Sequence, residues 1–161
     1  MQKKITTFLT FKDRAGEAAE FYASVFPDGK VTSMTRYPAS SAGTAGDVMT
    51  ATFELAGQEF VALNGGGSFD FSQGISLFVD CEDQAEVDEY WEKLTADGGK
   101  PGPCGWLEDK FGVSWQIIPR RLMELNSDPD PERAGRAIEA MLQMSKIEIA
   151  EIERAADGVP A

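Results

Sequence analysis

Residues 75–94, ISLFVDCEDQAEVDEYWEKL, can be laid without a gap over residues 6–25, TTFLTFKDRAGEAAEFYASV. At this constant offset of 69 residues, the aromatic pair YW falls on the aromatic pair FY. Each copy has the pattern of a strand followed by a helix with an acidic first turn. A repeat of this length predicts two copies of one supersecondary unit, each unable to bury its apolar face alone.

Periodicity and turn residues extend each copy to one helix and four strands. Ala56-Gly57 predicts a hairpin in the first unit, and Pro101 and Pro103 restrict one strand of the second unit to a sheet edge. The predicted strands are residues 4–11, 30–37, 47–55, 58–64, 74–81, 99–102, 104–108 and 113–118, and the predicted helices are 15–26 and 84–96. The pattern therefore predicts an α+β fold of two βαβββ units.

These units predict a domain of residues 1–126, made of repeats 3–65 and 74–119. Residues 127–161 are predicted to form a C-terminal helical tail, which starts at the motif DPDP. Its apolar positions are Ala137, Ile138, Met141, Leu142, Ile147, Ile149 and Ile152. Such a tail either packs on its own domain or covers a partner subunit, and we expect a homodimer.

The composition argues against several classes of protein. A formal net charge of −12 opposes binding to nucleic acid and to anionic membranes. The chain has no run of about 18 apolar residues and no signal-peptide pattern, so the cytoplasm is the expected location. Cys81 and Cys104 are the two cysteines, too few for a disulfide framework or a zinc site in a chain without histidine.

Three segments resemble the PhnB-like group of the vicinal oxygen chelate superfamily, a group also described as 3-demethylubiquinone-9 3-methyltransferase-like. They are AAEFYASVFPDGKV, EVDEYWEKLTADGG and CGWLEDKFGVSWQIIP. The superfamily includes glyoxalase I, extradiol dioxygenases and fosfomycin resistance proteins. The resemblance implies the glyoxalase/bleomycin resistance/dioxygenase-like fold, in which curved sheets surround a cup.

The resemblance also implies where a divalent metal would be held, on the first and last strand of each unit. These positions are Thr7, Val61, Ser76 and Gln116. Catalytic metal sites use imidazole, thiolate or carboxylate ligands, which this set lacks, so we expect no metal. We also expect no cofactor, because the glycines at 65–67 do not precede a helix as a dinucleotide loop would.

Strand alternation predicts which side chains face the cup and which face the helices. The expected cup residues are Thr7, Leu9, Ser76, Phe78, Ser114 and Gln116, whereas Phe8, Leu77, Trp115 and Ile117 are expected to face the helices. Trp106 either forms a wall of the cup, where it would stack on a flat ligand, or packs a strand edge. These residues predict a mostly apolar pocket for a small hydrophobic or aromatic molecule.

Two functional hypotheses follow from this pocket. The first is a metal-free protein that binds a small molecule, and the alternative is a group-transfer enzyme acting on a quinone-like ring. An enzyme needs an acid, base or nucleophile at the pocket, and the cup set contains none. Catalysis by Cys104 lacks a basic neighbour to activate the thiol, whereas a buried Glu54 or Glu59 in the cup would favour the enzyme. A scaffold that fills its own pocket is a third alternative.

Overall fold

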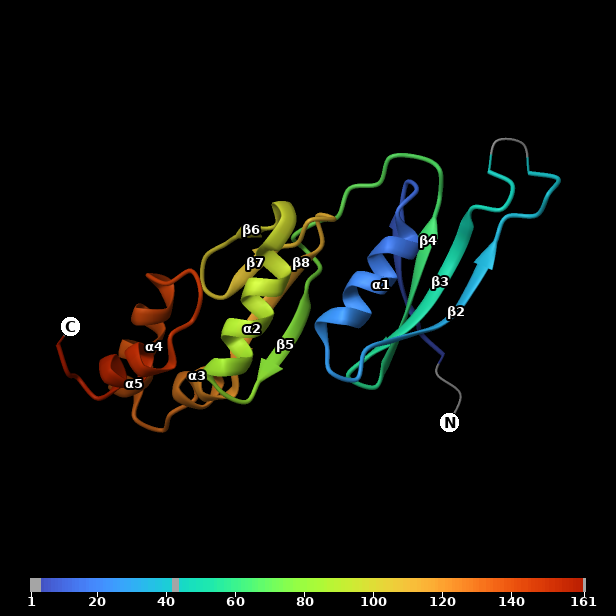
Figure 1. Cartoon of the computed structure of the whole chain (residues 1–161). Coiled ribbons are helices and arrows are strands. Elements are labelled where there is room, and N and C mark those ends of the chain that lie inside the picture. The colour runs from blue at the N-terminus through green and yellow to red at the C-terminus, as the bar shows by residue number, and fades with distance from the viewer. Residues whose placement is uncertain (1–3, 42–43, 161) are drawn as a thin grey trace. The chain divides into compact units, whose positions relative to one another are not determined.

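The computed structural model describes residues 4–41 and 44–160 of the chain. The chain forms two compact units, which divide between Asp70 and Phe71 (Figure 1). The first unit contains one helix and four strands: β1 (Thr7–Phe11), α1 (Ala15–Val25), β2 (Lys30–Arg36), β3 (Val48–Leu55) and β4 (Gln58–Asn64). Its strands form one sheet in the order β1-β4-β3-β2, in which β1 and β4 are parallel and the other pairs are antiparallel.

The second unit repeats this arrangement with the strand order β5-β8-β7-β6. Again the first and last strands, β5 and β8, are parallel neighbours, and the other pairs are antiparallel. The elements are β5 (Leu77–Cys81), α2 (Gln84–Thr95), a 3-10 turn η1 (Ala96–Gly98), β6 (Lys100–Pro101), β7 (Trp106–Glu108) and β8 (Ser114–Pro119). The prediction of an α+β fold of two βαβββ units is therefore confirmed.

Local chemistry explains several of these elements. Ala56 and Gly57 both have positive φ angles, 47° and 75°, as a two-residue hairpin between β3 and β4 requires. Asp83 caps α2, because its carboxylate accepts a hydrogen bond from the backbone N–H of Glu86. The weak strand predicted at the edge of the second sheet is β6, which has two residues.

The first sheet packs α1 against a row of aromatic rings. Tyr22 of α1 stacks on Phe53 of β3 with ring centroids 5.8 Å apart, and Phe53 stacks on Phe60 of β4 at 5.4 Å. Thr7 pairs with Phe60 in the parallel ladder and therefore lies on the same face of the sheet. We call the opposite face of each sheet, which faces away from α1 in the first unit and from α2 in the second, the open face.

The expected facing of β1 is therefore wrong. Thr7 and Leu9 lie on the α1 side, where Leu9 is buried, whereas Phe8 lies on the open face and is 54% exposed. The connection from β1 to α1 has three residues, 12–14, and that from β5 to α2 has two, 82–83. A gapless alignment that matches α1 with α2 is consequently shifted by one residue between β1 and β5. A shift of one residue places every side chain of a strand on the opposite face of the sheet.

The facing predicted for the second sheet is confirmed. Leu77 pairs with Trp115, and Trp115 and Ile117 are buried on the α2 side. Phe78 pairs with Gln116 on the open face, where Phe78 is half exposed. Because β1 and β5 are each five residues long and begin at Thr7 and Leu77, the true counterpart of Phe78 is Phe8.

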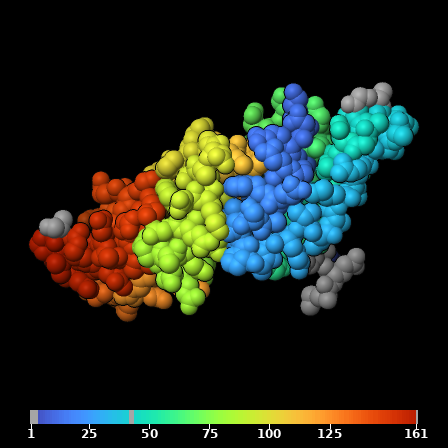
Figure 2. All heavy atoms as spheres, viewed as in Figure 1, coloured from blue at the N-terminus to red at the C-terminus, as the bar shows by residue number. Residues whose placement is uncertain are grey.

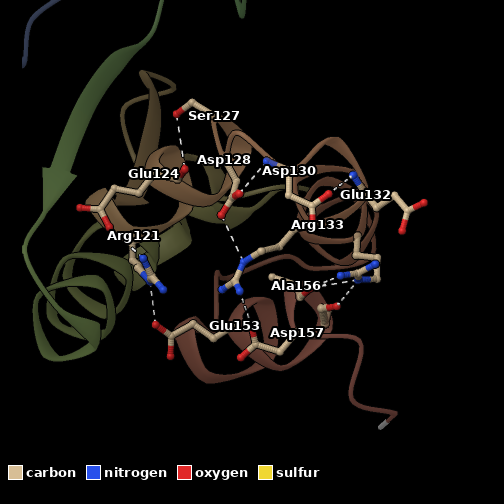
Figure 3. Close-up of polar contacts among 12 residues, drawn as sticks. Arg121, Glu124, Ser127, Asp128, Asp130, Glu132, Arg133, Glu153, Ala156 and Asp157 are labelled. Carbon is tan, nitrogen blue, oxygen red and sulfur yellow. Dashed lines mark hydrogen bonds and ion pairs between the residues drawn. The ribbon is translucent and has the colours of Figure 1, made fainter.

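The C-terminal residues form three helices: α3 (Arg120–Asn126), α4 (Pro131–Leu142) and α5 (Ile149–Ala156). The helical tail was predicted from the DPDP motif, and Asp130 does cap α4 by accepting from the N–H of Glu132. The sequence pattern did not predict α3. Ion pairs join the helices, between Arg121 and Glu153 at 2.7 Å and between Arg133 and Asp157 at 2.7 Å (Figure 3).

Of the two alternatives for the tail, the structure has it folded back on its own unit. Its apolar side chains share one buried cluster with β8 and α3, made of Ile118, Leu122, Leu125, Ala137, Ile147, Ile152 and Ala156. Surface ion pairs add little to stability, so this burial is the main attachment. A partner subunit is thus not needed to cover Ile147 or Ile152, and that argument for a dimer is wrong.

In the part of the chain that the structure describes, none of the helices has the length and apolar character needed to cross a bilayer.

Candidate binding site

The open face of the second sheet borders a hollow of about 450 Å³. Its lining includes the apolar residues Pro101, Pro103, Trp106 and Leu107, and the polar residues Gln73 and Ser114. Lys100 and Glu108 form an ion pair on neighbouring strands at 3.2 Å. Gly102 and Cys104 complete the lining. The chain around residue 100, yellow in Figure 2, reaches the surface of the second unit.

Five of the residues predicted from the sequence lie in the second unit, and two of them, Trp106 and Ser114, line this hollow. Trp106, Gln116 and Phe78 occupy one row across β7, β8 and β5, because each pairs with its neighbour in the sheet. The side-chain amide of Gln116 donates to the hydroxyl of Ser76 at 2.9 Å. Trp106 lines the hollow, as does the predicted Ser114, which is buried.

The residues predicted in the first unit have other surroundings. Thr7 borders a separate hollow of about 360 Å³ near the β3–β4 hairpin, and Leu9 is part of the core. The open face there carries Phe8 opposite Val61, at the strand positions that correspond to Phe78 and Gln116 in the second unit. The sequence alignment predicted that Phe8 would face the helices, whereas it lies on the open face.

The side chains at the four metal positions assigned from the sequence do not fit a catalytic divalent metal. In the second unit these positions hold a hydroxyl and an amide that already bond to each other. In the first unit, Val61 has no donor atom and Thr7 lies on the helix side of the sheet. Over residues 4–41 and 44–160, no three Cys, Asp or Glu side chains gather closely enough to hold one ion. We derive no chemistry through a metal at these positions.

The carboxylates that would favour an enzyme are not buried in a cup. Glu54 pairs with Lys30 at 2.8 Å, and its side chain is 33% exposed. Glu59, its cross-strand neighbour, is exposed. The carboxylate that does line the hollow of the second unit is Glu108, which the sequence reasoning missed because its role depends on the pairing of β7 with β6.

The turn between β6 and β7 forms one wall of the hollow. Cys104 has a φ of 57° and Gly105 a φ of 81°, so both are in the left-handed region that glycine favours. This conformation turns the chain sharply enough for the N–H of Gly102 to donate to the carbonyl of Trp106 at 2.8 Å. Cys104 is partly exposed at this wall, whereas Cys81 is buried.

The two thiols are expected to differ in reactivity. Burial, with added repulsion from the carboxylates of Glu86 and Asp80, raises the pKa of Cys81 to about 12. Because the thiolate is the nucleophile, Cys81 should stay unlabelled by iodoacetamide at pH 8 in the folded protein, and its labelling should rise only as the pH approaches 12. Mass spectrometry of tryptic peptides should find the label on Cys104. Equal labelling of both cysteines at pH 8 would contradict the buried environment of Cys81.

Comparison with known proteins now identifies the group. Residues 3–118 match the family model described as 3-demethylubiquinone-9 3-methyltransferase. The chain belongs to this family. A Bacillus cereus protein described as a putative 3-demethylubiquinone-9 3-methyltransferase, PhnB protein, is 40% identical, and the match covers 73% of this chain and 99% of that chain with a TM-score of 0.65. The predicted PhnB-like membership is thus confirmed.

More distant structures share the fold of the family. PA1353 from Pseudomonas aeruginosa is 20% identical over 71% of this chain and 95% of its own, with a TM-score of 0.59. The fosfomycin resistance protein FosX from Listeria monocytogenes is 16% identical over 71% of this chain and 90% of its own, with a TM-score of 0.50. Both likenesses support the vicinal oxygen chelate fold. No curated protein matches the chain.

Proposed function

We propose that this family member binds a small, largely apolar molecule with a flat ring in the hollow of the second unit, without a metal. The observation that carries the proposal is the hollow itself. Its volume of about 450 Å³ is in the range of small-molecule sites, which are mostly apolar with a few polar groups. Trp106 offers an aromatic face, and the prolines on either side of Gly102 form a stiff apolar wall.

Polar groups at the hollow support a ligand that carries an oxygen or nitrogen on its ring. The Ser114 hydroxyl and the Gln73 amide line the hollow, and both can donate and accept hydrogen bonds. The Lys100–Glu108 ion pair supplies an ammonium and a carboxylate, already balanced by each other. Of the other residues predicted for the site, Ser76, Phe78 and Gln116 belong to the second unit but do not line this hollow, and Thr7 and Leu9 belong to the first unit.

The family description favours a second candidate, a group-transfer enzyme that acts on a quinone-like ring. Methyl transfer would require a methyl donor such as S-adenosylmethionine and a base for the acceptor. Glu108 is the carboxylate that lines the hollow, and it forms an ion pair with Lys100. Calorimetry with S-adenosylmethionine separates the candidates: we expect no binding at millimolar ligand, and a micromolar Kd would favour the enzyme.

Trp106→Ala tests the binding proposal with N-phenyl-1-naphthylamine, a neutral aromatic fluorophore. Loss of the stacking face and its contact area should weaken binding of this probe about tenfold or more. Trp91→Ala is the matched control, because Trp91 is also partly exposed in the second unit but lies on α2, outside the hollow. Equal affinities of the wild type and both variants, measured by fluorescence titration, would remove Trp106 from the site.

We also propose that the protein is a homodimer. The support is the apolar surface that single chains expose, since Phe8 and Phe78 on the open faces are each about half exposed, and Ile75 is more exposed still. Light scattering at micromolar concentration should give about twice the 17.5 kDa of one chain. A mass near that of one chain would exclude the dimer.

A further inference from the structure

The connection between α4 and α5 bonds directly to the turn that forms a wall of the hollow. The N–H of Cys104 donates to the carbonyl of Met144 at 2.8 Å, and the N–H of Gly105 donates to that of Ser145 at 2.7 Å. In return, the Ser145 hydroxyl donates to the carbonyl of Gly102 at 2.6 Å. Three hydrogen bonds therefore join one short tail segment to one pocket turn.

The turn Gly102–Gly105 contains backbone conformations that neighbouring residues help to hold. Cys104 holds a left-handed backbone conformation, which is unfavourable for an L-residue with a side chain. Gly105 lies so close to the tail that a Cβ atom there would be 3.1 Å from Cγ1 of Ile147. The left-handed conformation at Cys104 is thus held against the tail by hydrogen bonds on both of its sides.

The tail segment is fixed at its other end as well. The side-chain amide of Gln84 on α2 donates to the carbonyl of Ile147 at 3.0 Å and accepts from the N–H of Ile149 at 2.8 Å. Lys146 pairs with Asp88 on the same helix. With Ile147 itself buried, the connection is anchored to α2 and presents Met144 and Ser145 to the turn.

This anchored segment lies outside the part of the chain that the family model matches, which ends at residue 118. The Bacillus cereus structure is matched over 99% of its own length by 73% of this chain, so the rest of this chain has no counterpart in that structure. The pocket wall is therefore supported here by residues that the matched region does not contain.

We propose that the α4–α5 connection is a positioning element for the binding site, and that Ser145 holds the turn Gly102–Gly105 in the conformation that shapes the hollow. The inference rests on the proposed function, because it assigns the tail a role in that same site. Ser145 acts through the turn and does not itself line the hollow. The tail would thereby set which ring shapes fit between Pro103 and Trp106.

The test compares Ser145→Ala with Ser127→Ala in the full-length chain. Both serines are exposed residues whose hydroxyl donates to a backbone carbonyl, and that of Ser127 donates to Met123 of α3. The first readout is the rate at which iodoacetamide labels Cys104, followed by mass spectrometry. The second is the Kd of N-phenyl-1-naphthylamine, and urea unfolding of each variant measures stability.

Loss of one hydrogen bond that holds the turn should change local equilibria about fivefold. Ser145→Ala should therefore label at Cys104 several times faster and bind the probe about fivefold more weakly. Ser127→Ala should match the wild type in both, and Ser145→Thr, which retains the hydroxyl, should restore both values. The urea midpoints of the two alanine variants should be close, which distinguishes a local effect from general destabilisation.

Two failures are distinguishable. If the wild type does not bind the probe, the proposed function fails for this apolar ligand, and the labelling rates still decide whether Ser145 holds the turn. If Ser145→Ala and Ser127→Ala label Cys104 at the same rate, the tail does not position the turn, whatever the probe binds.

Discussion

Replacing Asp109 by alanine is expected to lower the free energy of unfolding of the second unit by about 4 kcal/mol. Asp109 is 2% exposed, and its carboxylate accepts from the N–H groups of Phe111 and Val113 and from Nε1 of Trp115, the last at 2.8 Å. Alanine would leave these donors without the acceptor, and Trp115 is itself buried. A buried donor without a partner is costly because it has lost water as well.

Urea unfolding followed by tryptophan fluorescence measures this effect, since all three tryptophans lie after Phe71, in the second unit. Asp109→Asn should also destabilise strongly, because one carboxylate oxygen becomes an NH₂ group, which cannot accept a hydrogen bond from the indole or from the backbone N–H groups. Glu89→Ala is the control, an exposed acid paired with Lys93 on the surface of α2, and its effect should be small. A small effect of Asp109→Ala would show that water replaces the carboxylate.

Replacing Gly105 by alanine is expected to destabilise the second unit by about 3 kcal/mol. The new Cβ would lie 2.6 Å from Cδ1 of Ile118 and 3.0 Å from the carbonyl oxygen of Ile117, and the backbone is at a φ of 81°. Both backbone strain and overpacking therefore act at this position. Because Ile118 belongs to the core that holds the tail, the hollow should lose shape too, and N-phenyl-1-naphthylamine should bind more weakly.

Gly57→Ala separates strain from overpacking. Gly57 has a similar φ of 75°, but a Cβ there would have no atom within 4 Å. Its replacement should cost only the strain, about 1 kcal/mol. Since Gly57 lies in the first unit, whose residues include no tryptophan, its unfolding is followed by circular dichroism. Equal effects of the two substitutions would mean that the core around Gly105 relaxes freely.

The two units share a strand order but differ on their open faces. The first presents Phe8 opposite Val61, and the second presents Phe78 opposite Gln116, which bonds Ser76. The polar pair and the neighbouring Trp106 lie only in the second unit, within the residues described. This difference is why the proposed site lies there, although the sequence hypothesis used both units equally.

The sequence by itself determined the two βαβββ units, because hydrophobic periodicity and turn residues report local structure and a repeat confirms each assignment from its copy. The Ala56-Gly57 hairpin, the acidic start of α2 and the start of α4 at Asp130 all follow from local chemistry. The pairing of Gln116 with Ser76 could also be anticipated, since alternation from a correctly placed strand brings both to one face.

Only the tertiary structure decided the facing of β1 and the walls of the hollow. The facing depends on the one additional residue in the connection between β1 and α1, which a gapless alignment cannot detect. Glu108 and Lys100 meet through strand pairing, and Ser145 meets Gly102 across 43 residues of chain. Such contacts form because Ile147 and Ile152 are buried against β8 and α3. The sequence pattern shows that a helix has an apolar face, but the packing of the folded chain decides which element covers that face.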